Sequence, residues 1–306
     1  MLTEYYNVIL VMESNANSTA VKVNVLVVHF GSLEKLTSTI EQYSKQSYPD
    51  LSVHVYSNSF SEKGANHAHK MNVKTFLGQV GENVGYGQAI NRLLAHIGRK
   101  KGLYIFANDD VTLKNTTVNE LVHSYYLIKK LDTSVGPVSP NFKSGLLLDY
   151  TEGEKKVLDN IRSVSFSPGA FWLVDEDFLY KVGGFHPYFF MYGEDRELIN
   201  RSIQSGFTPY QIASCTVVHD FDYPPKSIEL RRNYHENTMA TVIISPSSDH
   251  RVLGAFKGLV LDAIKYKRFY EVIEISLALI RVLSQYSKLK MQQVDVNNQT
   301  RYRFLS

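Results

Sequence analysis

Two adjacent carboxylates, Asp109 and Asp110, follow a run of apolar residues in the stretch LYIFANDDV. Like charges repel, and each resists ionising beside a core of low dielectric, so the pair needs a reason to lie there. Mg²⁺ or Mn²⁺ prefers oxygen ligands and needs only one or two carboxylates when substrate phosphates supply the rest. One interpretation is a metal site, with Asp110 as the first candidate ligand and Asp109 able to bind a ribose hydroxyl or a water. A cap for the next helix explains the acids equally well.

A second acidic focus, Glu194 and Asp195, follows the aromatic stretch FFMY and precedes a helical pattern. Burial near such a pocket raises a carboxyl pKa toward that of a usable general base. The helix dipole also favours acids in a first turn, which explains the pair without any chemistry. His219, at the end of an expected strand, is either a metal ligand or a structural histidine. The pair His67 and His69 has a metal-like spacing, but a polar loop is the favoured reading.

The segment GENVGYGQAIN carries two glycines, Gly85 and Gly87, just before a helical pattern. Glycines there could let the backbone approach a phosphate or ribose, with amide N–H groups facing the ligand. The spacing lacks the third glycine of a dinucleotide fingerprint. A turn that packs against a neighbouring element explains the pattern equally well.

Hydrophobic periodicity predicts alternating strands and helices, and therefore an α/β domain with a mainly parallel central sheet flanked by helices. In such sheets ligands gather at the carboxyl ends of the strands, where Ser57, Asn58 and residues 108–110 fall. Strands are expected over 21–30, 51–59, 73–80, 102–110, 169–174 and 209–221, and helices over 32–46, 87–101, 118–131, 175–182, 194–206 and 228–290.

Composition narrows the class of protein. The 306 residues carry a net charge of +3, too weak for a nucleic-acid binder, and a single cysteine, Cys215, which excludes an intramolecular disulfide. The first 20 residues have neither a basic start nor a long apolar core, so we expect no secretory signal there. No segment approaches the roughly 18 uncharged apolar residues of a membrane-spanning helix. We therefore expect a soluble, cytoplasmic chain.

The C-terminal region is basic and helical. Residues 251–290 carry eight Lys or Arg against three acids, and Val272, Ile275, Leu279, Leu283 and Tyr286 share one helical face. Such helices dock on their own domain, on a second copy as a homodimer, or on an anionic membrane surface. Packing within the protein or a dimer is the favoured reading, and peripheral contact with the inner face of the cell membrane is the alternative.

Several stretches, taken in order, resemble the inverting glycosyltransferases of family 2, which have the GT-A fold, and most closely the rhamnosyltransferase-like enzymes of surface-polysaccharide assembly. The resemblance covers roughly residues 22–240. It is carried by VLVVHFGSLEKLTSTIEQYSKQSYP, ENVGYGQAIN, FANDDV, PGAFWLV, VGGFHPYFFMYGEDREL, RSIQSGF, VVHD and RRN. The order and spacing of these motifs carry the assignment, since each alone is modest.

The resemblance implies a role for each matching residue. Asp195 would deprotonate the acceptor hydroxyl, and Asp110 with His219 would hold Mn²⁺ or Mg²⁺. Inversion would follow from one direct displacement. The donor nucleotide would contact His29, Ser57, Asn58, Asn83, Gly85, Asn91, Asn108 and Asp109, and the donor and acceptor cleft would be lined by Gly169, Trp172 and Glu194.

Three positions depart from the family pattern. The first strand ends in His29-Phe30-Gly31 rather than a Tyr-Asn pair. Ser57 stands where an Asp usually reads the uracil or thymine ring, and a hydroxyl can hydrogen-bond a base but supplies no charge. His186 follows Gly-Gly-Phe, where Asp is common. These departures place donor identity in question more than the fold.

The expected protein is a metal-dependent transferase that moves a sugar, rhamnose from dTDP-rhamnose, to a hydroxyl of a growing surface glycan or lipid-linked glycan. A UDP-linked donor is the nearest alternative. A sugar-phosphate nucleotidylyltransferase and a non-catalytic glycan-binding or scaffold relative stay open. The expected organisation is an extension over 1–20, the transferase domain over 21–240 and a helical region over 241–306.

Overall fold

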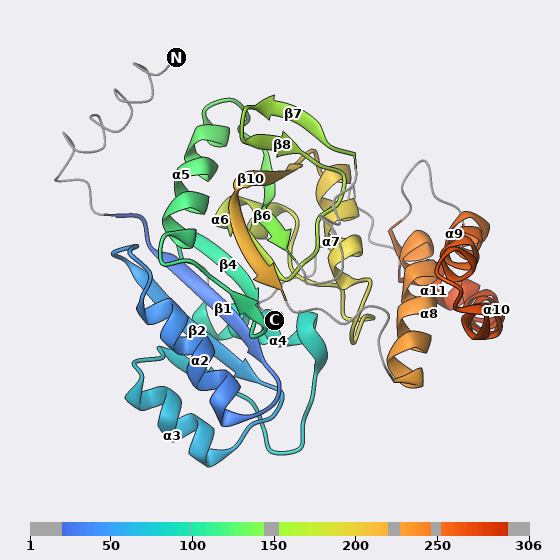
Figure 1. Ribbon diagram of the computed structural model, residues 1–306, viewed down its shortest axis with the longest axis horizontal. Coiled ribbons are helices and arrows are strands. Elements are labelled where there is room, and N and C mark those ends of the chain that lie inside the picture. The colour runs from blue at the N-terminus through green and yellow to red at the C-terminus, as the bar shows by residue number, and fades with distance from the viewer. Residues whose placement is uncertain (1–19, 99, 144–152, 220–226, 246–251, 293–306) are drawn as a thin grey trace.

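The computed structural model describes residues 20–98, 100–143, 153–219, 227–245 and 252–292. It contains an α/β domain and a smaller helical unit beside it (Figure 1). The expected extension lies almost wholly outside the described residues, as do residues 246–251 and 293–306. In the described part of the chain no helix is long and apolar enough to cross a membrane.

One mixed sheet forms the centre of the α/β domain, in the order β3-β2-β1-β4-β9-β6-β10-β8-β7, with β5 paired to β10. The first four strands of this order are parallel, and β9 runs antiparallel between β4 and β6. β-Branched runs form the central strands because both of their faces are covered. The strands are β1 (Val23–His29), β2 (Leu51–Ser57), β3 (Thr75–Leu77), β4 (Leu103–Asn108), β5 (Val111–Thr112), β6 (Val135–Lys143), β7 (Lys155–Leu158), β8 (Ile161–Ser163), β9 (Phe171–Asp175) and β10 (Thr208–His219).

Helices cover both faces of this sheet. One buried cluster joins alternate residues of β1 to α2 (Leu33–Ser44), α3 (Glu62–Lys70) and α5 (Thr117–Lys129). The cluster on the opposite face joins the other β1 residues to α4 (Gly85–Ile97), α6 (Glu176–Lys181) and α7 (Glu194–Gln204). This two-sided burial follows from the period of two along a strand. It fixes the carboxyl ends of β1, β2 and β4 at one edge.

The helical unit has a third hydrophobic cluster of its own. It consists of α8 (Ile228–Ile244), α9 (Val252–Lys265), α10 (Phe269–Ser284) and α11 (Tyr286–Met291). Because α8 packs with the three later helices, the unit begins at residue 228, and the boundary expected at 240 falls inside α8. Phe189 of the α/β domain inserts into the same cluster.

The apolar face expected over residues 272–286 is confirmed in part. Ile275 is buried and Val272 and Leu279 pack against the third cluster, but Leu283 is exposed, and so is Tyr286, which begins α11. The fully buried residues of α10 are Glu271, Ile275, Ala278 and Val282. The sequence pattern was ambiguous because α10 has apolar residues on several sides.

Candidate active site

The two adjacent acids at the end of β4 face different partners. Asp109 is buried: its Oδ2 lies 2.7 Å from His29 Nδ1 and accepts the Phe30 N–H at 2.9 Å, while its Oδ1 pairs with Lys35 Nζ at 2.8 Å. Both oxygens are thus engaged within the protein. Asp109 ties β4 to the end of β1 and to α2, and the expectation that it binds a ribose hydroxyl or a water finds no support in these contacts.

Asp110 faces the other side, toward the end of β10. Its Oδ1 lies 3.2 Å from His219 Nε2 and is buried without a hydrogen bond, and Asn108 Nδ2 lies 3.4 Å from the same nitrogen. Burial favours the neutral acid, but the neighbouring imidazole and the Lys35 charge outweigh it and lower the pKa of Asp110. A charged carboxylate with an unbonded oxygen, beside an imidazole and an amide side chain, suits a divalent cation.

The protein alone supplies few metal ligands here. Within the described residues, no group of three or more His, Cys, Asp or Glu is arranged to hold a metal ion. Mg²⁺ and Mn²⁺ sites commonly take one or two protein carboxylates and complete their shell with water and substrate phosphates. Asp110, His219 and Asn108 therefore fit a metal that is held together with a diphosphate.

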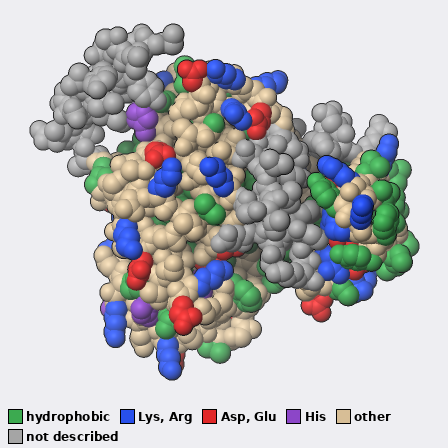
Figure 2. All heavy atoms as spheres, in the orientation of Figure 1, with side chains coloured by type: hydrophobic (Ala, Val, Ile, Leu, Met, Phe, Trp, Pro, Cys, Tyr) green, Lys and Arg blue, Asp and Glu red, His purple; other side chains and the backbone are tan. Residues whose placement is uncertain are grey.

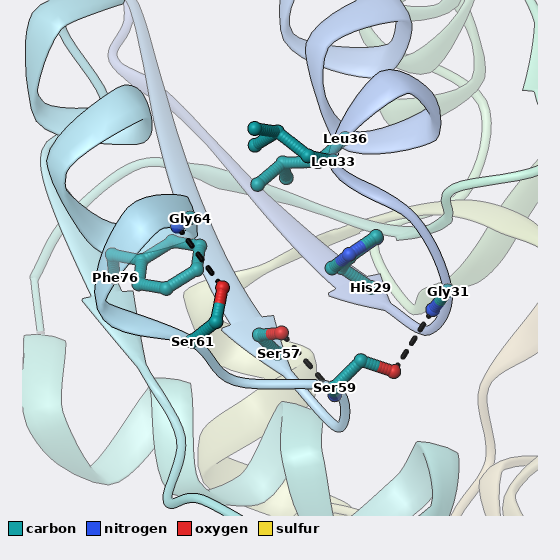
Figure 3. A pocket seen from close by; sticks show the side chains of 9 residues that line it. All are labelled: His29, Gly31, Leu33, Leu36, Ser57, Ser59, Ser61, Gly64 and Phe76. Atoms are coloured by element: carbon teal, nitrogen blue, oxygen red, sulfur yellow. Dashed lines mark hydrogen bonds between the residues drawn. The ribbon is translucent and has the colours of Figure 1, made fainter.

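A hollow opens beside the ends of β1 and β2, and its volume, part of it open to solvent, is about 220 Å³ (Figure 3). Three serines on one side accept backbone N–H bonds: Ser57 Oγ from Ser59, Ser59 Oγ from Gly31, and Ser61 Oγ from Gly64, at 3.2, 2.9 and 3.1 Å. Each hydroxyl hydrogen is left able to donate. The other lining residues are His29, Leu33, Leu36 and Phe76.

The loop before α4 is held by side chains that had been expected to contact the donor. Asn58 accepts from Val84 N at 3.0 Å and donates to Gly85 O at 3.3 Å, while Asn83 Oδ1 accepts from Gly85 N at 3.0 Å. Asn91 both donates to Phe185 O at 2.8 Å and accepts from Phe185 N at 3.0 Å. These amides position the loop.

The two glycines of this loop face protein. Gly85 has φ +79°, and a Cβ built there would lie 1.9 Å from Phe190 O. A Cβ at Gly87 would lie 2.7 Å from Phe185 Cβ. The pair permits close packing of α4 against residues 185–190, which is the packing alternative to a phosphate-facing turn.

The second acidic focus lies at the start of α7. Glu194 Oε2 is buried with no hydrogen-bond partner, and burial, reinforced by the Asp195 charge, raises the Glu194 pKa to about 8. Burial also raises the pKa of Asp195, although its oxygens accept from Arg196 N at 2.7 Å and Gly169 N at 3.3 Å. Near neutral pH Glu194 is therefore mostly protonated.

Tyr86 joins the acidic groups and was not singled out from the sequence. Its hydroxyl donates to Gly169 O at 2.9 Å. Burial raises its pKa well above the ordinary value, and the charges of Glu194, Asp195 and Asp110 act in the same direction. The half-buried Tyr86 thus bonds to the residue whose own N–H donates to Asp195. A tyrosine between two motif glycines was the available signal.

The expected cleft residues differ in their exposure. A Cβ at Gly169 would lie 2.9 Å from Asp195 Cβ, so this glycine lets the backbone approach the carboxylate. Trp172 is fully buried, and its Nε1 donates to Ser167 Oγ at 3.1 Å. The expectation that Trp172 lines the cleft is therefore wrong, because the strand alternation points its ring into the core behind Gly169.

The backbone before Glu194 is strained and is held by α8. Tyr192 and Gly193 have φ +65° and +85°, and positive φ is costly for tyrosine. Asn237 Nδ2 donates to Met191 O at 2.8 Å and to Tyr192 O at 3.0 Å. Sequence reasoning missed Asn237, since a polar residue within a helix gives no sign of its partner.

Comparison with solved structures identifies the fold. The mannosyltransferase PcManGT from Pyrobaculum calidifontis, in complex with GDP-Man and Mn²⁺, is 13% identical, with TM-score 0.52 over 90% of this chain and 85% of that chain. GalNAc-T7 with UDP, GalNAc and Mn²⁺ is 12% identical, with TM-score 0.56 over 89% and 58% of the two chains. S. aureus TarS is 12% identical, with TM-score 0.56 over 89% and 83%. The chain has the GT-A glycosyltransferase fold, as predicted.

Sequence comparison adds little to this. No protein-family model matches the chain. Cytochrome P450 710A4 of Arabidopsis thaliana is 29% identical over 140 residues, which are 40% of this chain and 27% of that protein, so the chain spans about a quarter of that relative. A haem thiolate needs a cysteine that faces a cofactor pocket, whereas Cys215, the single cysteine, is buried within the hydrophobic cluster of the sheet. The site gives no support to a haem protein.

Proposed function

We propose that the protein is a metal-dependent inverting glycosyltransferase that moves rhamnose from dTDP-rhamnose to a hydroxyl of a growing glycan. The observation that carries the proposal is the joining of both acidic foci by residues 169–170: Gly169 N donates to Asp195 Oδ2 at 3.3 Å, and Asn108 N donates to Ala170 O at 2.9 Å. A diphosphate site beside a raised-pKa carboxylate suits sugar transfer, because departure of the nucleotide and deprotonation of the acceptor must occur close together. The inverting mechanism and the choice of rhamnose rest on the sequence resemblance.

The donor diphosphate would lie at the ends of β4 and β10. Asp110, His219 and Asn108 would hold Mn²⁺ or Mg²⁺, which supplies positive charge to offset that of the departing nucleoside diphosphate. Lys35 forms an ion pair with Asp109 but is partly exposed, and its ammonium lies close to the same sheet edge. Asp109 thereby fixes a cation near the phosphates without contacting them.

The base would enter the hollow lined by the three serines. Their available hydroxyl hydrogens suit the two carbonyl oxygens of thymine or uracil. In the neutral His29 tautomer that donates Nδ1–H to Asp109, Nε2 is an acceptor and suits the ring N–H of the same bases. Phe76 offers an apolar surface. The three serine hydroxyls and His29 would therefore take over base binding from the aspartate that is usual at position 57. Their hydrogen-bonding capacity supports a dTDP- or UDP-linked donor.

Asp195 is the proposed base for the acceptor hydroxyl. Its raised pKa makes it a better proton acceptor than an exposed carboxylate, and the Gly169 and Arg196 amides fix its direction. Glu194 stays protonated near neutral pH and so leaves Asp195 to carry the charge. One displacement, with the acceptor attacking opposite the nucleotide, inverts the sugar carbon without a covalent enzyme intermediate.

Thermal stabilisation by nucleotides tests the proposal first. UDP, dTDP, GDP and CDP, each with and without Mn²⁺, should raise the melting temperature only where they bind the native state. We expect Mn²⁺-dependent shifts with dTDP and UDP, followed by transfer from dTDP-rhamnose in a product assay. Stabilisation by dTDP without transfer from dTDP-rhamnose, but with transfer from a UDP-sugar, would overturn the donor assignment. No shift with any nucleotide at millimolar concentration would support a non-catalytic protein.

A further inference from the structure

The outer side of the helical unit exposes a continuous apolar surface. On α10, Phe269, Ile273 and Ile280 are 62%, 68% and 63% exposed, and Leu277 lies between the last two on the same helical face. On α9, Leu253, Leu261 and Ile264 are also exposed. Hydrophobic side chains gather over this part of the molecule among several Lys and Arg (Figure 2). Large exposed apolar patches of this kind mark interaction surfaces.

This surface is additional to the side that holds the unit together. α10 buries Ile275, Ala278 and Val282 against α8 and α9. Apolar residues on the outer side of the same helix indicate that this side also packs against an apolar partner. The α9–α10 pair therefore has one face packed inside the protein and one that is unpartnered in the described chain.

The turn between α9 and α10 combines aromatic rings with cations. Tyr266, Phe269 and Tyr270 are exposed there, and Lys265 Nζ lies 5.0 Å from the Tyr266 ring centroid. Lys267, with φ +57°, forms the corner. Amphipathic rings beside long basic side chains suit a boundary between water and lipid, where the rings lie at the headgroup level and the ammonium groups reach outward.

The charges distinguish a lipid surface from a second copy of the chain. Three acids of the unit are paired: Glu271 with Arg268 at 2.7 Å, Glu274 with Arg231 at 3.1 Å and Glu236 with Arg281 at 2.5 Å, whereas Glu229 and Asp262 have no ion pair among the recorded contacts of the described residues. The exposed cations without such a recorded pair outnumber these two acids, namely Arg232, Lys257, Lys265, Lys267, Lys288 and Lys290. A symmetric dimer through this face would bring these like charges together, whereas anionic headgroups would offset them.

We propose that the outer face of α9 and α10, here called the docking face, binds the surface of an anionic lipid bilayer. The apolar side chains enter the headgroup and acyl boundary, and the lysines contact the headgroup charges. No helix among the described residues can span a bilayer, so the contact is peripheral. The proposal does not depend on the transferase activity.

Vesicle co-sedimentation of the full chain tests the docking face. We expect binding to phosphatidylglycerol-containing vesicles, weak binding to pure phosphatidylcholine, and loss of binding in about 1 M salt, where charges are screened. The double variant Ile273→Glu with Leu277→Glu should weaken binding by about tenfold or more. Leu131→Glu is the matched control, because Leu131 is 62% exposed on the α/β domain. An unchanged melting temperature would show that each variant folds.

A tryptophan reporter gives a second measurement. Phe269→Trp should shift its emission to the blue with anionic vesicles, while Leu131→Trp should not, and the native Trp172 is buried in both. Absence of vesicle binding would overturn the proposal. So would a dimer in solution that Ile273→Glu converts to monomer, since a second copy would then cover the face. Equal binding by Ile273→Glu and wild type would also overturn it.

Discussion

The His186 side chain links the α/β domain to the last residue described in the helical unit. Its Nε2 donates to Gln292 O at 3.0 Å, and its Nδ1 accepts from Tyr188 N at 3.0 Å. Because a carbonyl only accepts and an amide only donates, the two bonds fix one neutral tautomer. Burial lowers the pKa of His186, which keeps it neutral. The departure from the family pattern at this position thus has a structural role.

His186→Leu should weaken that link. The substitution leaves the half-buried Tyr188 N–H and Gln292 C=O without this partner, and we expect the free energy of unfolding to fall by about 1–3 kcal/mol. Denaturant unfolding measures this. His69→Leu, at an exposed histidine of α3, is the control and should have little effect. Equal stabilities of the two variants would contradict the role of His186.

Asp195→Asn should abolish most turnover while leaving donor binding intact. Loss of a general base commonly costs about 10²–10⁴-fold in rate. Product assays give kcat, and nucleotide titration gives the affinity. Asp177→Asn, at an exposed acid of α6, should keep full activity. If Asp195→Asn turns over like wild type, another group deprotonates the acceptor.

Asp109→Asn should lower stability, whereas the adjacent Asp110→Asn should lower metal-dependent nucleotide binding. Asp109→Asn removes the negative charge that pairs with Lys35 and weakens the bond to His29, so the free energy of unfolding should fall by about 1–3 kcal/mol. Asp110→Asn should fold normally but lose the Mn²⁺-dependent part of nucleotide binding, as EDTA would in wild type. Calorimetric titration with dTDP, with and without Mn²⁺, separates them. Metal-dependent binding that survives Asp110→Asn would remove this residue from the metal site.

Glu194→Gln should stabilise the protein at alkaline pH. The folded-state pKa of about 8 exceeds that of an unfolded glutamate, so the folded state binds more protons between these values. Stability therefore falls as pH rises through that window, by an amount on the order of a few kcal/mol. Glutamine removes this loss. The melting temperatures of Glu194→Gln and wild type should agree near pH 4 and differ at pH 8. A difference that stays constant over this range would contradict the raised pKa of Glu194.

The sequence predicted six of the ten described strands, the sheet edge and the two acidic foci, because these are local patterns. It missed β5, β6, β7 and β8, and the polar loop expected around His67 and His69 is the helix α3. Buried apolar runs ending in polar residues locate the edge, whatever the partners are. It could not assign Asp109 and Asp110 to opposite sides, since His29 and His219 lie far from them along the chain. Nor could it exclude Trp172 from the cleft. A one-residue alternation decides which way a strand side chain points, and the strand began two residues later than expected.

The close approach of Gly85 to Phe190 has a consequence for how this site can vary. The atoms nearest to the absent Cβ are the carbonyl oxygen and carbon of Phe190, which every amino acid possesses. Replacement at 85 should therefore be rejected whatever stands at 190, while the side chain at 190 has wider freedom. If every amino acid were tested at both positions, position 85 should tolerate almost no replacement, whereas position 190 should tolerate many. Their coupling, being carried by main-chain atoms, would leave little covariation between related sequences.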